Sequence, residues 1–154
     1  MIRPIRLDDA EAVGAMAQEL NAAMRALGDK NDGRFDATCF RRDGFGDRPA
    51  FKGLIAEEDG EAQGYLLYNE IYDTDLAQRA LFVIDLYVRP AARGQGFGCA
   101  LMDEAEALCR AADGGALLWG VLHQNAAAMA FYEMLGARYV DDVRFMVLRL
   151  PAAS

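Results

Sequence analysis

One stretch of the chain combines residue types that can bind an anion: VRPAARGQGFGCALM, from Val88 to Met102. It leaves an apolar run through Arg89 and Pro90, passes glycines at the alternate positions 94, 96 and 98, and then takes on helical spacing. The amides of the first turn of a helix have no partner within the helix, and glycines let a phosphate approach the backbone closely. The stretch therefore predicts a phosphate-binding loop.

Three kinds of phosphate loop have this outline: a P-loop, a dinucleotide-binding Rossmann loop and a coenzyme A loop. A P-loop ends in Gly-Lys-Ser or Gly-Lys-Thr, which the stretch lacks. Rossmann spacing counted from Gly94 requires glycine at position 99, where Cys99 stands, and it normally follows an early strand of a βαβ unit. The spacing therefore excludes a P-loop and fits a Rossmann loop poorly, and it leaves two interpretations open: a coenzyme A loop, or a glycine-rich turn that binds no phosphate.

Size and charge restrict the partners of the chain. Its 154 residues are 53% hydrophobic and 26% charged, which are the values of a globular protein, and we expect a single domain spanning residues 1–154. The net charge of −8 repels phosphate backbones and anionic lipids, and it favours the approach of a cationic substrate. We therefore expect no nucleic-acid partner and no membrane partner.

The cysteines and the histidine give no sign of a metal site or a disulfide framework. Cys39, Cys99 and Cys109 have no CxxC spacing, and His123 has no second ligand close in sequence. The first residues, MIRPIRLDDAE, lack the apolar stretch of a signal peptide, and no apolar run of about 18 residues occurs. We expect a reduced, cytoplasmic protein.

Hydrophobic periodicity predicts an α+β domain with a mixed sheet. The expected strands are a first one at Ile2–Leu7, a hairpin of 51–57 and 61–70, buried strands at 80–88 and 116–122, and one or two strands within 138–149. The expected helices are one after a cap at Asp8, a short one near 36–43, one over 95–112, and one from a cap at Asn125 to a left-handed Gly136.

Taken together, VRPAARGQGFG resembles the signature of the GCN5-related N-acetyltransferases, whose diphosphate loop reads Arg or Gln, two residues, Gly, one residue, Gly or Ala. Arg93, Gly96 and Gly98 match it, and NAAAMAFYEMLGARYV at 125–140 is similar to the second block of the family. The resemblance covers most of residues 1–150. It implies a three-layer α/β fold with a mixed, mostly antiparallel central sheet of six to seven strands flanked by helices.

The resemblance also implies acetyl-CoA as the cofactor and a set of residues that hold it. Tyr132 aligns with the family tyrosine that donates a proton to the leaving sulfur, and a backbone N–H near Leu86 would stabilise the developing oxyanion. Without the resemblance, Tyr132 is an ordinary residue of a packed helix face and Asn125 a helix cap. The implied cofactor-binding residues are Leu86, Tyr87, Val88, Arg93, Gly94, Gln95, Gly96, Phe97, Gly98, Cys99 and Asn125.

A narrower resemblance connects DGFGDRPAF (43–51), the pair Tyr72 and Asp73, and IDLYV (84–88) to the diamine acetyltransferase branch. It implies a substrate site that includes Tyr72, Asp73 and Asp85, and a homodimer with shared acceptor sites. The glutamate that serves as the base of the branch corresponds to Ile84, whose side chain accepts no proton.

An alkylamine with a pKa near 10 must lose a proton before it attacks a thioester, so some group has to accept that proton. Asp85 is the acidic candidate on the cofactor strand, and two roles stay open for it: proton acceptor, or carboxylate that only positions the amine. His123 is an alternative base at a strand end.

The sequence thus predicts an N-acetyltransferase that moves an acetyl group from acetyl-CoA to a primary amine of a small, cationic acceptor, by direct attack in a ternary complex. The acceptor would be a polyamine, a diamine or an amino-acid-like molecule. A ping-pong route through Cys99 is not expected. Two alternatives remain: a non-catalytic acyl-CoA-binding regulatory module, which the Ile84 substitution keeps open, and a protein or peptide N-acetyltransferase.

Overall fold

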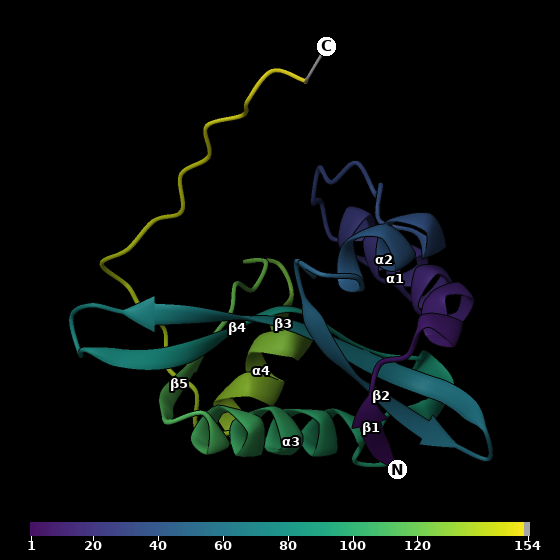
Figure 1. Cartoon of the computed structure of the whole chain (residues 1–154). Coiled ribbons are helices and arrows are strands. Elements are labelled where there is room, and N and C mark those ends of the chain that lie inside the picture. Colours follow the sequence, from purple (N-terminus) through teal and green to yellow (C-terminus); the bar gives the residue numbers. More distant parts are fainter. Residues whose placement is uncertain (153–154) are drawn as a thin grey trace.

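A computed structural model describes residues 1–152 and shows a central sheet between two sets of helices (Figure 1). Within these residues the sheet has five strands in the order β1-β2-β3-β4-β5. The strands are β1 (Ile2–Pro4), β2 (Lys52–Glu58), β3 (Glu61–Asp73), β4 (Gln78–Val88) and β5 (Gly114–Leu118). The helices are α1 (Ala10–Ala26), α2 (Ala37–Gly44), α3 (Phe97–Ala111) and α4 (Ala126–Met134). The α+β class is confirmed, with five strands in place of the expected six to seven.

Pairing in the sheet is antiparallel from β1 to β4 and parallel between β4 and β5. The predicted hairpin of β2 and β3 is confirmed, and Asp59 and Gly60 in its turn have φ values of 52° and 79°. A parallel pair needs a crossover connection, which α3 supplies. The loop that was predicted to bind phosphate therefore lies at the start of this crossover.

Apolar residues form a core on each face of the sheet. The cluster beneath α1 and α2 includes Val13, Met16, Phe40, Tyr65 and Tyr87, and the cluster beneath α3 includes Leu54, Leu66, Leu81, Leu101 and Met102. Alternation along β3 sends Tyr65 to the first cluster and Leu66 to the second. Helices therefore cover both faces, with α1 and α2 on one side and α3 and α4 on the other (Figure 1).

A bulge interrupts β4 in its second half. Leu67 pairs with Asp85 while the next residue of β3, Tyr68, pairs with Val83, so Ile84 is an extra residue. The prediction of a strand buried on both faces holds for the first half, where Ala80 on one face and Leu81 and Val83 on the other are buried, and it fails at Ile84, which is 40% exposed. The extra residue turns this side chain out of the pleat.

The start of α1 differs from the prediction. Leu7–Asp9 form a 3-10 turn and α1 begins at Ala10, so the predicted cap at Asp8 is wrong. The neighbouring Asp9 holds this turn, because its carboxylate accepts hydrogen bonds from the Arg6 N–H at 2.6 Å and from the guanidinium of Arg3 at 2.8 and 2.9 Å.

The other predicted helices are present with small shifts of their ends. The helix expected near 36–43 spans 37–44, and the helix expected over 95–112 spans 97–111. Gly136 has a φ of 90°, which confirms the left-handed end after α4. None of the helices within residues 1–152 is long and apolar enough to cross a membrane.

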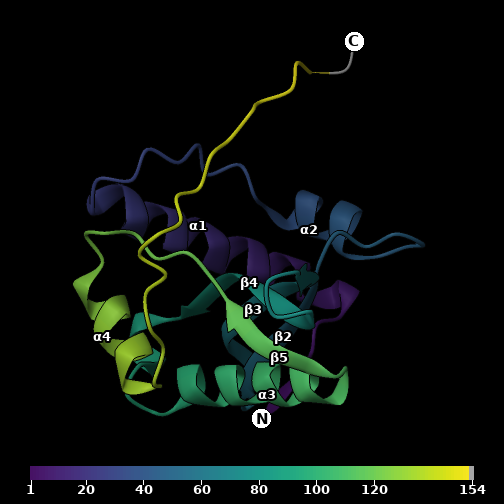
Figure 2. The ribbon, with the colours of Figure 1, turned by 90° about the vertical axis from the view of Figure 1, so that its left-hand side faces the viewer.

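The end of the chain is the main departure from the predicted fold. The strands expected within 138–149 are wrong, because this segment is coil apart from a turn at Asp141 and Asp142, and the strand expected at 116–122 is shorter, at 114–118. After α4 the chain runs away from the body (Figure 2). A strand needs a partner for its backbone N–H and C=O groups, and in residues 1–152 this segment has none.

Close pairing of β3 and β4 gives a test of the fold at Gly64. A Cβ atom there would lie 2.6 Å from the carbonyl oxygen of Tyr87, a backbone atom that cannot retreat from a paired strand. We expect Gly64→Ala to lower the free energy of unfolding by about 1–3 kcal/mol in urea denaturation. The control is Gly120→Ala, where no atom lies within 4 Å of the new Cβ. Equal stability of the two variants would contradict this register.

Candidate functional site

The site begins where β4 and β5 separate. Their pairing runs from Arg79 with Gly114 to Phe82 with Leu118 and then stops, although β4 continues to Val88. Within residues 1–152, the second half of β4 therefore has no strand on its β5 side. A cleft of about 900 Å³ lies there. This volume is in the range of small-molecule sites, which is roughly 300–1,000 Å³.

Four parts of the chain line the cleft, and most of the lining is apolar. They are β4 with Leu86 and Val88, the end of α1 with Leu20, Ala23, Met24, Ala26 and the following Leu27, the turn and start of α3 with Ala92, Arg93, Gly94 and Gly96–Cys99, and Asn125 with α4 up to Met134. The polar side chains of the lining are Arg93, Asn125 and Tyr132, together with the thiol of Cys99. An apolar cleft with a few polar groups is typical of a site for an organic ligand.

The glycine-rich loop forms one end of the cleft. Gly94 and Gly96 are left-handed, with φ values of 77° and 87°, and a Cβ atom at either position would meet nothing within 4 Å. Gly96 is the N-cap of α3, so the first amides of that helix, at Phe97–Cys99, have no helical partner. Open space in front of unpaired amides at a helix start fits the diphosphate of coenzyme A.

Side chains of the loop hold its shape. The Nε of Arg93 donates to the carbonyl of Val88 at 3.0 Å, and its guanidinium lies 5.7 Å from the ring centroid of Tyr87. Gln95 is exposed, and its side chain donates to the carbonyl of Ala91 at 3.2 Å. Of the predicted cofactor residues, Tyr87 and Gln95 lie beside the cleft and do not line it.

Asn125 lines the cleft and is also the N-cap of α4. Its Oδ1 accepts from the N–H of Ala128 at 3.1 Å, which confirms the predicted cap, and its Nδ2 lies 3.8 Å from the sulfur of Met24 on α1. The Nδ2 of Asn125 therefore donates to Met24, and both residues line the cleft. Across the cleft, a Cβ at Gly98 would lie 3.2 Å from the ring of Phe131, so this glycine allows α3 and α4 to approach closely.

Asp85 is an acidic group beside the cleft: it does not line the cleft, but its charge acts on Tyr132, which does. Its Oδ2 accepts from the hydroxyl of Tyr65, a fully buried residue of β3, at 3.2 Å. Burial raises the pKa of the Asp85 carboxyl above its ordinary value, and the hydrogen bond from Tyr65 offsets part of that increase. A carboxylate with a raised pKa is a better proton acceptor. Sequence reasoning missed Tyr65, whose only signal was its place in an alternating strand.

Tyr132 supplies the hydroxyl of the site. Its ring centroid lies 4.9 Å from that of Trp119 and 5.4 Å from that of Phe131. Burial raises the pKa of Tyr132, and the negative charge of Asp85 raises it further, so the hydroxyl keeps its proton at neutral pH. Within residues 1–152 the hydroxyl makes no side-chain hydrogen bond. Trp119, which follows the last residue of β5, was also missed from the sequence.

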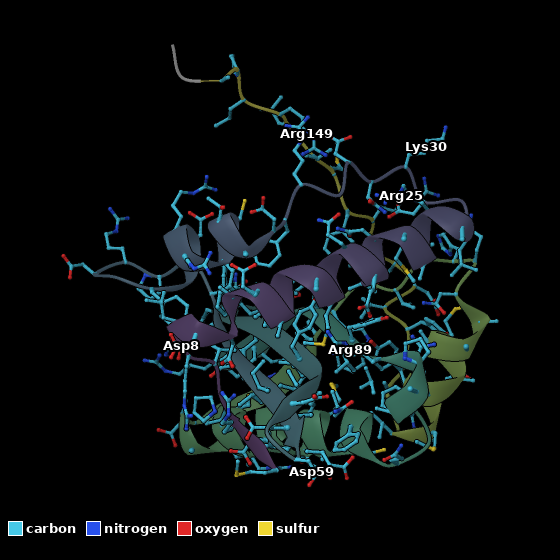
Figure 3. The ribbon with its side chains drawn as sticks, turned by 90° about the vertical axis from the view of Figure 1, so that its right-hand side faces the viewer. Asp8, Arg25, Lys30, Asp59, Arg89 and Arg149 are labelled. Atoms are coloured by element: carbon cyan, nitrogen blue, oxygen red, sulfur yellow. The ribbon has the colours of Figure 1, made fainter. Side chains whose placement is uncertain are left out.

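Helix α1 is tied to the end of β4 by Glu19. The hydroxyl of Tyr87 donates to its carboxylate at 2.9 Å, and the Nε of Arg89 lies 3.7 Å from the other carboxylate oxygen. Figure 3 shows Arg89 beneath α1. These contacts hold α1, with Met24 on its cleft side, against the strand that enters the glycine-rich loop.

The structure does not bring Tyr72 and Asp73 to the cleft. They lie at the outer end of β3, where Tyr72 pairs with Arg79, about 20 Å along β4 from Asp85. The carboxylate of Asp73 accepts from backbone N–H groups of the following turn, at 3.0 and 3.3 Å. Asp73 therefore has a structural role there, and the role of this pair in substrate binding stays a prediction.

His123 and Ile84, the other residues that the sequence singled out, are exposed. His123 lies in the loop between β5 and α4, and Ile84 lies at the bulge. Cys99 is half-buried in the cleft wall at the start of α3.

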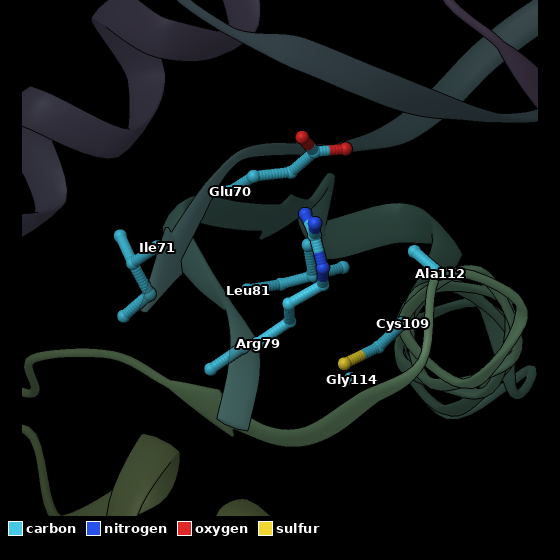
Figure 4. Close-up of a pocket in the computed structure, with 8 residues that line it drawn as sticks. Glu70, Ile71, Arg79, Leu81, Cys109, Ala112 and Gly114 are labelled. Atoms are coloured by element: carbon cyan, nitrogen blue, oxygen red, sulfur yellow. The ribbon is translucent and has the colours of Figure 1, made fainter. Parts of the chain in front are cut away.

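A second, small pocket lies near the start of β4. Figure 4 shows it between Glu70, Arg79, Leu81 and Cys109. Its volume of about 20 Å³ holds little more than one water molecule. Of these two hollows, the large cleft is the one of the size of an organic ligand.

Comparison with known proteins indicates the family of the chain. A family model described as the acetyltransferase (GNAT) family matches residues 15–137. The thialysine N-epsilon-acetyltransferase of Sus scrofa is 33% identical over 150 residues, which cover 92% of this chain and 86% of that protein. The L-ornithine N5-acetyltransferase of Arabidopsis thaliana is 28% identical over 81 residues, covering 53% of this chain and 36% of that protein.

Solved structures agree on the fold. An integron cassette protein from the mobile metagenome of V. cholerae superposes with a TM-score of 0.80 at 21% identity, covering 97% of this chain and 91% of that one. The resemblance that the sequence suggested is thus confirmed. The chain belongs to the acetyltransferase (GNAT) family of acetyl-CoA-dependent N-acetyltransferases.

Proposed function

We propose that this enzyme transfers the acetyl group of acetyl-CoA to a primary amine of a small, cationic molecule, by direct attack in a ternary complex. One observation carries the proposal: the cleft between the separated strands joins unpaired helix amides at one end to Tyr132 on α4. Asp85 lies near enough for its charge to raise the pKa of Tyr132. Groups for binding, for accepting a proton and for donating one are therefore close together.

The chain offers a group for each part of the cofactor. The amides from Gly94 to Cys99 would hold the diphosphate, and the Nδ2 of Asn125, which donates to the sulfur of Met24 in this structure, would donate to the pantetheine arm. When bound, acetyl-CoA supplies an acyl group activated as a thioester. The backbone N–H of Leu86, on the strand that has lost its partner, would donate to the oxygen that gains negative charge during attack.

Asp85 is assigned the role of proton acceptor. An alkylamine is mostly protonated at neutral pH, with a pKa near 10, so removal of its proton has to accompany attack. The Asp85 carboxyl has a raised pKa and a fixed orientation, because Tyr65 donates to one of its oxygens at 3.2 Å. Asp85 lies next to Ile84, the position at which the diamine branch has its glutamate base. Its carboxylate would take over the role of that base.

Tyr132 is assigned the role of proton donor to the departing sulfur. Its raised pKa keeps the hydroxyl protonated, and its ring is held against Trp119 and Phe131. A thiol has a pKa of about 8.5, so proton donation helps the sulfur leave and is not an absolute requirement. Loss of the hydroxyl should therefore slow the reaction without abolishing it.

The acceptor class follows from charge and from the relatives. The net charge of −8 favours a cationic molecule, and the named relatives act on thialysine and on L-ornithine. A small diamine, polyamine or amino-acid-like amine fits both observations. Asp85 would bind the reacting amine, and the place of Tyr72 and Asp73 at the outer end of β3 leaves them no direct contact with it in the same chain.

Release of free thiol tests the proposal. Purified protein is mixed with acetyl-CoA and a panel of polyamines, diamines, amino acids and peptides, and the free thiol is followed with time. Amine-dependent thiol release is expected for at least one small cationic amine. A non-catalytic binding module would instead show stabilisation by the cofactor in a thermal melt and no thiol release, and preference for peptides would show a protein acetyltransferase.

The role of Tyr132 is tested by Tyr132→Phe. We expect kcat to fall roughly 10-fold to 100-fold, at the low end of acid–base contributions, with little change in the affinity for acetyl-CoA. The matched control is Tyr139→Phe, because Tyr139 is exposed and donates only to Glu133 on the surface. Unchanged kcat in Tyr132→Phe would remove the residue from the mechanism.

The role of Asp85 is tested by the pH dependence of kcat. The base works when deprotonated, so activity should rise with pH through the pKa of Asp85. Tyr65→Phe removes the hydrogen bond that lowers this pKa, so the acidic limb of the profile should move to higher pH. The control is Tyr68→Phe, a buried tyrosine on the opposite face of β3. If the limb stays in place in Tyr65→Phe, or if Asp85→Asn keeps full activity, Asp85 is not the base.

The role of the loop is tested by Gly96→Ala. An alanine at a φ of 87° is strained, so the loop should rearrange and calorimetry should show a loss of coenzyme A affinity of 10-fold or more. Gly46→Ala is the control, since Gly46 has a φ of 90° and equally open surroundings but lies outside the cleft. Equal affinity of the two variants would show that the loop does not hold the diphosphate.

A further inference from the structure

Two opposite charges lie beside the cleft without a close contact, on Glu19 of α1 and on Arg89 at the end of β4. Their chain neighbours Leu20 and Val88 line the cleft. The Nε of Arg89 lies 3.7 Å from a carboxylate oxygen of Glu19, beyond hydrogen-bond distance, and within residues 1–152 this buried nitrogen has no acceptor. The side chains are still accessible, at 33% exposed for Arg89 and 42% for Glu19. An incoming anionic group would therefore stabilise the arginine.

Arg89 continues a row of side chains on the face of β4 that α1 covers (Figure 3). Asp85, Tyr87 and Arg89 are alternate residues of the chain, so they share one face of an extended strand. The backbone is still extended at Arg89, with a φ of −55° and a ψ of 142°, and its N–H donates to a carbonyl of β3 at 2.9 Å. Leu86 and Val88, which line the cofactor cleft, lie on the other face.

Two tyrosines hold the carboxylates along this row. Tyr65 and Tyr87 pair across β3 and β4, with ring centroids 6.4 Å apart. The hydroxyl of Tyr65 donates to Asp85 at 3.2 Å, and the hydroxyl of Tyr87 donates to Glu19 at 2.9 Å. The charges therefore follow β4 in the order of two carboxylates, at Asp85 and Glu19, and then the guanidinium of Arg89.

This order of charges matches an α-amino acid with an amine at the end of its side chain. The terminal amine would meet Asp85, and the α-amino and α-carboxylate groups would meet Glu19 and Arg89. A diamine or polyamine has no carboxylate, so one of its cations would face the guanidinium and be repelled. The Cα atoms of Asp85 and Arg89 are about 13 Å apart, a span that an extended amino acid fills together with the two side chains.

The place of Arg89 assigns its anion to the acceptor. The diphosphate of the cofactor would lie at the amides of Gly94–Cys99, inside the cleft, where Arg93 is the cation of the lining. Arg89 is not part of that lining. A carboxylate of the acceptor, arriving on the face of Asp85, is the anion that Arg89 would bind.

We propose that Arg89 and Glu19 recognise the α-carboxylate and the α-amino group of an amino-acid acceptor, whose terminal side-chain amine is acetylated. A guanidinium suits this task, because two of its N–H groups match the two oxygens of a carboxylate. The inference rests on the proposed acetyl transfer, since Asp85 fixes the reacting end of the acceptor. It makes Arg89 and Glu19 the residues that select an amino acid over a polyamine.

Binding to the complex with coenzyme A tests this recognition without turnover. Calorimetry compares free lysine with cadaverine and free ornithine with putrescine, because the members of each pair differ only in the carboxylate. We expect each amino acid to bind roughly 10-fold or more tightly than its diamine, the effect of hydrogen bonds to a charged group. Equal binding within the pairs, tighter binding of the diamines, or no binding of either amino acid would overturn the proposal.

Arg89→Gln should remove the preference. The affinity for lysine should fall roughly 10-fold or more, while cadaverine and coenzyme A should bind as tightly as to the wild type. Arg89→Lys keeps the charge but loses the paired donors, so its affinity for lysine should be intermediate. The control is Arg110→Gln, because Arg110 is exposed and pairs with Glu106 on α3. A preference that survives in Arg89→Gln, or a loss of coenzyme A affinity in either Arg89 variant with an unchanged circular dichroism spectrum, would contradict the assignment.

Glu19→Gln tests the other half of the pair. The amide keeps an oxygen for the hydroxyl of Tyr87 and loses the negative charge, so free lysine should bind more weakly. Nα-acetyllysine has no α-ammonium group and should bind equally to the variant and the wild type. Equal loss for both ligands would show that Glu19 acts only on the structure of the site.

Thiol release from acetyl-CoA is followed as a separate measurement. Its absence with every amine would contradict acetyl transfer and leave the binding preference as measured. Turnover without a preference for amino acids over their diamines would contradict the recognition by Arg89 and Glu19 and leave acetyl transfer standing.

Discussion

The site depends on one constraint, the end of pairing between β4 and β5 after Phe82 and Leu118. Every backbone N–H and C=O group needs a partner, so a strand that loses its neighbour presents these groups to whatever enters the gap. The separation also decides where the chain goes next. β4 continues into the glycine-rich loop and α3, while the chain after β5 turns toward α4, and the two routes form opposite walls of the cleft. A fully paired sheet would have no room for a ligand at this position.

The bulge at Ile84 determines which way the side chain of Asp85 points. Because one extra residue is inserted, the alternation of β4 shifts, and Asp85 lies opposite Leu67 with its carboxylate beside the Tyr65 hydroxyl. Burial and a single hydrogen bond act in opposite directions on its pKa, and burial prevails. The same charge acts on Tyr132 and keeps its proton in place. The raised pKa of Asp85 favours proton uptake by its carboxylate, and the raised pKa of Tyr132 favours proton retention, which is the separation that the proposed acid–base roles require.

The sequence predicted the features that depend on local rules. The glycines at 94 and 96, the cap at Asn125 and the turn at Asp59 and Gly60 each have the conformation or contact that their residue types favour. Features that depend on contacts between distant segments were missed. Tyr65 meets Asp85 across two strands, and Trp119 meets Tyr132 across the loop between β5 and α4, so neither pair has a spacing that sequence shows. The bulge was missed for the same reason, because it is a property of two strands in register.

The C-terminal segment, residues 138–149, shows the difference between what a local residue pattern predicts and what contacts with distant segments decide. Its apolar residues on alternate sides specify a strand with two covered faces, and the prediction of strands there rested on that pattern. In the structure the same residues are coil, since the backbone of a strand is satisfied only by a neighbour. The unpaired edge of β5 lacks such a neighbour as well. Whether such a pattern becomes a strand is therefore decided by a neighbouring backbone, which the residues of the segment do not specify by themselves.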